Sequence, residues 1–207
     1  MSTLTRVLDD VIAKYAGGEH ELEAAAARGQ FLEATGKVMD DEPGWDERMA
    51  AFLEWYTLER KMEGGELRPI DRYRREQTLS AEDVEAAEAL AASHWSLFQT
   101  LEIQPGRVHI EDLLRGGRYI VHERRKLAGI DAGDVFEGRL VSEGGKTLFG
   151  RSFTFHPRDA VGAIREYVAE AAKAGDAKQD VLFKLAERRW RCDRYHNVHV
   201  NKVYAYR

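Results

Sequence analysis

The stretch WRCDRYHNVHVNKVYAYR, residues 190–207, holds the side chains of this protein that come nearest to a reaction centre. Cys192, His196 and His199 are spaced C-x3-H-x2-H, and thiolate and imidazole are the groups that hold structural zinc. Such a site takes about four protein ligands, and the chain has no second cysteine. The valines around His199 favour a strand, in which the two histidines point to opposite faces. We therefore expect no metal site and no cofactor.

A second possibility is that Cys192 acts as a nucleophile with a histidine, because members of a catalytic group meet in space rather than in sequence. The adjacent Arg191 and Arg194 would lower the pKa of its thiol. One thiol among arginines is weak support, however. The segment GGKT at 144–147 resembles the end of a phosphate-binding loop, but the strand-like LFGRSFTF follows it where a helix is required, so we expect a hairpin turn. We predict a protein that is not an enzyme and keep an enzyme using Cys192 as a further alternative.

The charge of the chain is unevenly distributed. The net charge is −5, yet residues 1–94 hold 11 Lys/Arg against 21 Asp/Glu, a net −10, and residues 178–207 hold 8 against 3, a net +5. An acidic first half and a basic end could attract each other or face partners. The chain has no apolar run of about 18 residues, no signal-peptide pattern and one cysteine, so we expect a cytoplasmic protein without a membrane segment.

The basic end carries the residues that we predict to bind a partner. They are Arg188, Arg191, Arg194, Tyr195 and Lys202, interleaved with Trp190 and further tyrosines. A protein partner is the leading prediction. Nucleic acid is the alternative, bound by a small barrel over 95–157 together with this end, because guanidinium groups can meet phosphates while aromatic rings stack on bases. A pI near 5.9 opposes long-range attraction to a polyanion. The sequence leaves open whether this end is docked or free, and what the oligomeric state is.

The elements that must position these residues begin with helices. Apolar residues recur at three- and four-residue steps from Leu4 to Tyr15 and stop at a glycine pair. Further helices are predicted over 21–34, over WDERMAAFLEWYTLERK, and from an N-cap at Ser80 to Ala92.

From Trp95 the period changes to two. Five short strands separated by glycine turns predict an antiparallel meander, forming a small barrel or a strongly bent sheet. Helices over 158–173 and 181–190 and a short final strand follow. The sequence thus predicts an α+β fold with a helical lobe (1–94), a barrel-like region (95–157) and a C-terminal part (158–207), which form one integrated unit.

Three segments carry a family resemblance. ARGQFLEATGKVMDDEPGWDERMAAFLEWYTLERK, the strand-rich SLFQTLEIQPGRVHIEDLLRGGRYIVHERRKLAGIDAGDVFEGRLV and the ending DRYHNVHVNKVYAY resemble a group of uncharacterised bacterial proteins, mostly myxobacterial. The first two also resemble the region that precedes the zinc-binding SEC-C module. That four-ligand module is absent here, so its zinc does not carry over. The resemblance implies that the C-terminal segment belongs to the fold, and it supplies no catalytic residue. The resulting hypothesis is a non-catalytic interaction or regulatory protein.

Overall fold

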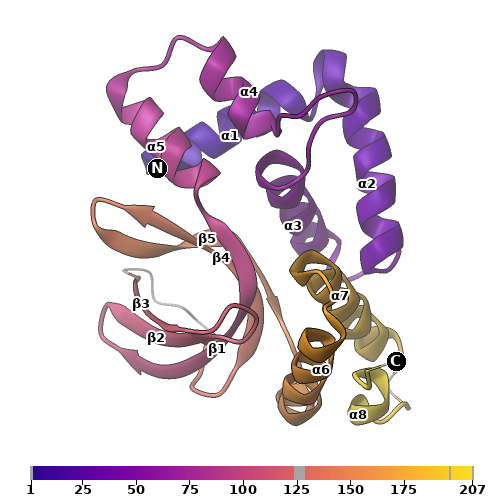
Figure 1. The fold of residues 1–207 in the computed structure, drawn as a ribbon. Helices are drawn as coiled ribbons and strands as arrows, with labels where there is room; N and C mark the ends of the chain where they lie inside the picture. Colours follow the sequence, from indigo (N-terminus) through magenta and orange to yellow (C-terminus); the bar gives the residue numbers. More distant parts are fainter. Residues whose placement is uncertain (1, 124–128, 196, 207) are drawn as a thin grey trace. The chain divides into compact units, whose positions relative to one another are not determined.

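The computed structural model describes residues 2–123, 129–195 and 197–206. These residues form the α+β fold that the sequence predicts (Figure 1). The helices are α1 (Thr3–Tyr15), α2 (Glu21–Thr35), α3 (Trp45–Leu58), α4 (Pro69–Glu76), α5 (Ala81–Ala91), α6 (Val161–Ala174), α7 (Lys178–Arg194) and α8 (Val200–Val203). The strands are β1 (His94–Gln104), β2 (Arg107–Asp112), β3 (Arg118–His122), β4 (Val135–Glu143) and β5 (Lys146–Phe155).

The chain divides into two compact units, and each is assembled from three segments. Unit 1 consists of Met1–Leu32, Val38–His94 and Val141–Gly145. Unit 2 consists of Glu33–Lys37, Trp95–Leu140 and Lys146–Arg207. By formal charge, unit 1 holds 10 Lys/Arg against 21 Asp/Glu, a net −11, and unit 2 holds 21 against 15, a net +6. The predicted three-part division of the chain stays a prediction.

Unit 1 is helical, as its periodicity predicts. Helix α1 begins where the Ser2 hydroxyl accepts a hydrogen bond from the Thr5 amide at 3.2 Å, an N-cap. The apolar face of α1 is buried and packs against α3, α4 and α5. The Tyr56 hydroxyl on α3 donates to the Tyr15 carbonyl at the end of α1 at 2.8 Å. This bond provides a partner for a buried phenol and for one of the carbonyls that a helix end leaves unpaired.

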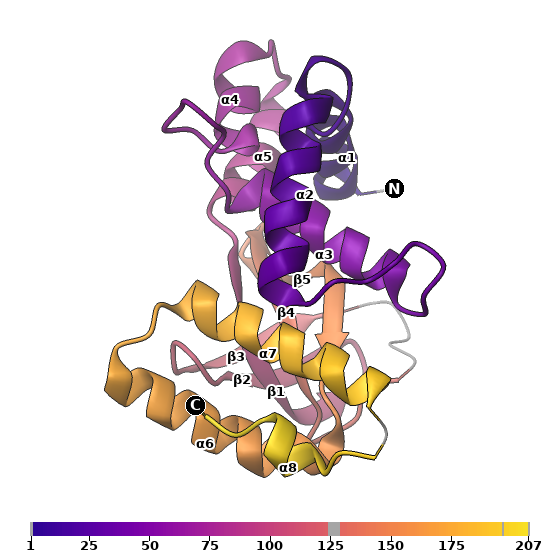
Figure 2. The same cartoon turned by 90° about the vertical axis from the view of Figure 1, so that its right-hand side faces the viewer.

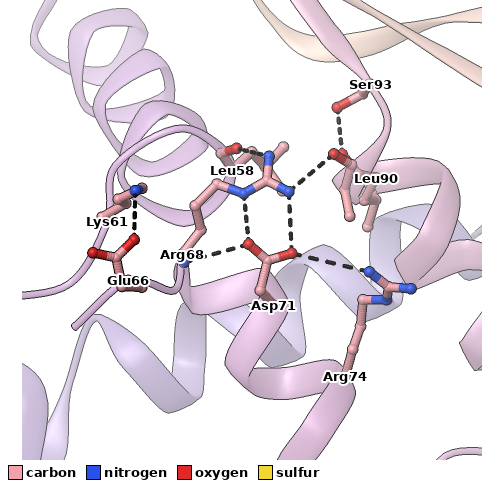
Figure 3. A network of polar contacts seen from close by, with 9 residues as sticks. Leu58, Lys61, Glu66, Arg68, Asp71, Arg74, Leu90 and Ser93 are labelled. Carbon is pink, nitrogen blue, oxygen red and sulfur yellow. Dashed lines mark hydrogen bonds and ion pairs between the residues drawn. The ribbon is translucent and has the colours of Figure 1, made fainter.

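Helix α4 is absent from the sequence-based expectations, and Arg68 holds its first turn in place (Figure 3). The guanidinium donates to the Asp71 carboxylate at 2.7 Å and 3.1 Å. It also donates to the carbonyls of Leu58, at the end of α3, and Ala91, at the end of α5, at 2.8 Å and 3.2 Å. One side chain thus joins the ends of two helices to the start of a third.

The five strands are neighbours in the ring order β1-β2-β3-β5-β4 (Figure 1). Strands β1 and β2, and strands β2 and β3, pair antiparallel as predicted, whereas β3 and β5 are parallel and are bridged at Val121 and Thr147. The expectation of a wholly antiparallel meander is therefore wrong, because β5 returns beside β3 instead of extending the sheet past β4. The pairing between β3 and β5 is short, so the five strands form a mixed, strongly bent sheet that does not close into a regular barrel. The order, with β3 parallel to β5, is that of the OB-fold, a partly open five-stranded barrel.

The turn between β4 and β5 contains the segment GGKT, residues 144–147, which resembles the end of a phosphate-binding loop. Gly144 and Gly145 have φ angles of 55° and 72°, which suit a two-residue hairpin turn between antiparallel strands. Strand β5 follows directly at Lys146. Because no helix begins there, the segment is the predicted hairpin.

Aromatic rings fill the inside of the bent sheet. Phe136 lies at the centre, with ring centroids of Phe98, Phe149, Phe153 and Phe155 between 5.5 Å and 5.8 Å away. Edge and tilted contacts at these distances stabilise aromatic clusters beyond their burial alone. This core belongs to unit 2 and holds the strands in their curved arrangement.

Helices α6, α7 and α8 lie together along one side of the sheet and form a second core with it (Figure 2). Val203 and Tyr204 at the end of the chain belong to this core and are 5% and 0% exposed. The predicted short final strand is wrong, because a strand would point these neighbouring side chains to opposite faces. The single helical turn of α8 buries both, and the His199 ring nitrogen Nδ1 caps its start by accepting from the Asn201 amide at 3.3 Å.

Candidate binding site

Helix α7 positions the predicted partner-binding residues. Its buried side carries Val181, Leu182, Leu185 and Trp190, spaced along one face of a helix. Asp180 lies in its first turn, and Arg191 and Arg194 lie in its last turn, which is the favourable arrangement of charges in the helix dipole. The basic end of α7 therefore also stabilises the helix.

The indole of Trp190 anchors this end of the helix within unit 2. Its Nε1 donates to the Lys37 carbonyl at 2.9 Å. Gly36 makes the close approach possible, because a Cβ there would lie 3.1 Å from the indole ring and its φ is 91°. Arg189 adds a hydrogen bond to the Phe155 carbonyl and an ion pair with Asp193. These contacts hold the last turn of α7 in place.

Arg188 belongs to the interior network of the fold. Its side chain is 11% exposed, and its guanidinium lies 4.6 Å from the centre of the Tyr167 ring. It donates to the Lys184 and Ala205 carbonyls at 3.1 Å and 3.3 Å. Because these bonds occupy the guanidinium, the structure gives Arg188 a role in holding the last residues of the chain on α7.

The other four predicted residues are exposed. Arg194 lies over the Trp190 ring at 5.2 Å, a cation–π contact that orients it. Arg191 makes one long ion pair with Glu187 at 3.7 Å on the same helix, which is worth little. Tyr195 is 56% exposed and the neighbouring Val198 is 44% exposed. We call Arg191, Arg194, Tyr195, Val198 and Lys202 the C-terminal basic surface.

A buried polar chain fastens the segment that carries Lys202. The Tyr204 hydroxyl and the His156 Nδ1 are 2.8 Å apart, whereas the His156 Nε2 lies 3.4 Å from the Glu137 Oε1 without a hydrogen bond to it. Burial raises the pKa of Tyr204 well above its ordinary value, so the phenol stays protonated. The imidazole and the phenol are both fully buried, so no substrate reaches them in this arrangement.

The burial of Glu137 was not predictable from the strand pattern. In the pattern VFEGRLVSE, the alternation of Phe136, Gly138 and Leu140 predicts that Glu137 and Arg139 face solvent. They are 4% and 2% exposed, and the Glu137 carboxylate faces the buried His156 imidazole at 3.4 Å. Only contacts distant in sequence, which the strand pattern does not contain, could have identified these two residues.

Cys192 is half-buried beside the second core of unit 2. Burial raises the pKa of its thiol, and this outweighs the lowering by Arg189 and Arg191. The expectation of a lowered pKa at Cys192 is therefore wrong, although Arg191 acts in the expected direction. A thiol that holds its proton is a poor nucleophile at neutral pH.

Of the three residues in the C-x3-H-x2-H spacing, the structure describes Cys192 and His199. His196 lies outside the described residues, and His199 is an exposed helix cap. Within the described part of the chain, no group of three or more His, Cys, Asp or Glu side chains has the arrangement to hold a metal ion. Among the same residues, no helix has the length and apolar character needed to cross a membrane.

Comparison with known proteins gives one match. Residues 2–184 match the model of a family described as a family of unknown function (DUF7986). No curated protein and no solved structure matches the chain. The matched region includes the whole sheet and ends before Arg188, so the C-terminal basic surface lies beyond it.

Proposed function

The chain belongs to the DUF7986 family, whose function is unknown, and we propose that it is a non-catalytic binding protein of the cytoplasm whose partner is another protein. The reactive side chains of the described residues support this proposal. The Cys192 thiol holds its proton, and the Glu137–His156–Tyr204 chain is sealed inside unit 2. The bacterial, mostly myxobacterial resemblance and the likeness to the region before SEC-C modules remain expectations.

One observation carries the proposal: the C-terminal basic surface combines exposed cations with exposed apolar area on a segment that is packed onto unit 2. Arginine and tyrosine are enriched at the centres of protein interfaces. Here the Trp190 anchor and the docked α8 hold the backbone of this surface in place, so a partner does not have to order that backbone when it binds. A partner with acidic and apolar side chains fits this chemistry.

The test is capture of the partner by the whole chain from extract of its own cells. Arg191→Ala, Arg194→Ala, Tyr195→Ala and Lys202→Ala are combined in one variant. The control combines Lys173→Ala, Lys178→Ala and Lys184→Ala, which removes the same number of cations from exposed positions of α6 and α7. We expect one defined polypeptide, quantified by mass spectrometry, to be retained by the native chain and the control and lost with the surface variant. Equal retention by all three, or retention of nothing, would refute the proposal.

Nucleic acid is a second candidate partner, and a specific observation favours it. The strand order of unit 2 is that of the OB-fold, and proteins of that fold bind oligonucleotides or oligosaccharides on the face of strands 2 and 3. Fold alone does not determine function, so nucleic-acid binding would depend on the side chains on that face. Binding to a labelled single-stranded oligonucleotide that weakens steeply with salt would support this candidate.

A further inference from the structure

Strand register places six side chains on the outer side of β2, β3 and the start of β5. Arg107 is opposite His122, His109 is opposite Ile120, and Glu111 is opposite Arg118. Their neighbours Val108, Ile110 and Val121 are buried inside, so alternation turns these residues outward. Lys146 precedes Thr147, the bridge partner of the inward Val121, and therefore points outward beside Ile120. We call Arg107, His109, Arg118, Ile120, His122 and Lys146 the outer sheet face.

The charge on this face is unbalanced. Among the described residues, Arg107, Arg118 and Lys146 are exposed and make no ion pair. Of the three acidic side chains in the same rows, Glu111 is neutralised by Arg165 from α6 at 2.9 Å. The other two are Glu102, which lies on β1 opposite His109, and Glu143, which lies across the β4–β5 turn from Lys146. Three cations are thus left against two carboxylates, in a unit whose formal charge is +6.

The spacing of the cations selects the kind of anion. Arg118 and His122 are the two ends of β3, which puts them about 13 Å apart along the strand, and Arg107 is next to His122 on the neighbouring strand. A single small anion cannot reach both ends of this face, whereas a chain of phosphates can. The two turn-proximal cations, Arg107 and Lys146, directly follow the β1–β2 and β4–β5 turns.

The side chains between the cations suit exposed bases. Ile120 is 46% exposed at the middle of β3. His109 lies opposite it on β2, and His122 lies two residues further along β3 on the same face. Imidazole rings can stack on unpaired bases, and apolar side chains can pack on them. In a duplex the bases are already stacked on each other, so these contacts favour a single strand.

We infer that the outer sheet face binds single-stranded nucleic acid, with Arg107, Arg118 and Lys146 contacting successive phosphates along the strand. This inference rests on the nucleic-acid candidate above and adds its substrate class and its residues. The C-terminal basic surface is not part of it.

The experiment measures binding of the whole chain to a fluorescent oligothymidylate over a range of salt concentrations. One variant combines Arg107→Ala, Arg118→Ala and Lys146→Ala. The control is the Lys173, Lys178 and Lys184 alanine variant, which removes three cations from the same unit. Arg118→Glu alone is a second variant that reverses one charge at an exposed position. Circular dichroism melting curves verify that each variant is folded.

For three phosphate contacts, we expect the logarithm of affinity to fall against the logarithm of salt concentration with a slope of about −2, since each contact on a single strand contributes about 0.7. The triple variant should lose about tenfold or more in affinity at low salt and most of this slope. Arg118→Glu should weaken binding, and the control should bind as the native chain does.

Several results would overturn the inference, and they can be told apart. If the triple variant binds within twofold of the native affinity and the C-terminal surface variant loses binding, the nucleic-acid site lies outside the outer sheet face. Single-stranded nucleic acid is not the ligand if the native chain binds a duplex with the same affinity. The same holds if it binds polyglutamate with the same affinity and the triple variant weakens that binding equally. No binding by the native chain would remove the nucleic-acid candidate itself and leave the protein-partner proposal standing.

Discussion

Tyr204 offers the sharpest test of whether the end of the chain is a packed part of the fold. Its side chain is fully buried, and its hydroxyl bonds to His156 at 2.8 Å. In Tyr204→Phe the ring stays and only this bond is lost. The His156 Nε2 already lacks a hydrogen-bond partner, so the substitution leaves both ring nitrogens of a buried imidazole without one. We expect a loss of about 1–3 kcal/mol in the free energy of unfolding.

Tyr204→Ala also removes the buried ring and should cost about 3–5 kcal/mol. For a chain of this length, each kcal/mol lowers Tm by about 2–4 °C. The measurements are urea unfolding curves and thermal melts followed by circular dichroism. Tyr195→Phe is the matched control, because that side chain is 56% exposed, and its change should stay within about 0.5 kcal/mol. If both Tyr204 variants also stay within that limit, the C-terminal segment does not contribute to the fold and the reasoning is wrong.

Two further predictions concern unit 1. Arg68→Ala leaves the Asp71 carboxylate and the Leu58 and Ala91 carbonyls without their hydrogen-bond donor. It should lower the free energy of unfolding by about 2–4 kcal/mol in urea titrations, and an effect under about 0.5 kcal/mol would contradict this role. Burial acts to raise the pKa of Asp71, but the hydrogen bonds and charge of Arg68 outweigh it and lower that pKa. The native chain therefore has this stabilisation above an ordinary Asp pKa of 3.8 and loses it as pH falls further, whereas the variant should show a weaker acid dependence. Burial raises the pKa of Tyr56 to about 12, so its stabilisation is complete below the ordinary 10.0 and is lost as pH rises towards 12; Tyr56→Phe should reduce this alkaline loss in unfolding curves.

The helices of unit 1 were predictable because their local pattern coincides with their burial. In α1, the residues from Leu4 to Tyr15 that repeat at helical spacing are the buried ones. Helix α4 was not predictable in the same way, since its eight residues PIDRYRRE contain few apolar side chains. Its start depends on Arg68 reaching the ends of α3 and α5, which are contacts distant in sequence.

In unit 2 the sequence identified strands but not how they neighbour one another. Periodicity shows that β3 and β5 exist, whereas their parallel pairing depends on how the chain returns across the sheet. The same limit applies to the candidate sites. Arg191 and Arg194 were found as a local cluster of charge, whereas the outer sheet face gathers Arg107, Arg118 and Lys146 from three strands and is visible only once the register is known.

The three-segment make-up of each unit has a consequence for how this protein can be divided. A fragment ending at His94 lacks Val141–Gly145, and the complementary fragment lacks Glu33–Lys37, with the carbonyl that holds the Trp190 indole. No single cut of the polypeptide releases either half intact. Recombination that transfers one half to another gene would therefore have to transfer the coding sequence of both halves. Limited proteolysis between the halves should yield nicked products rather than separately stable pieces.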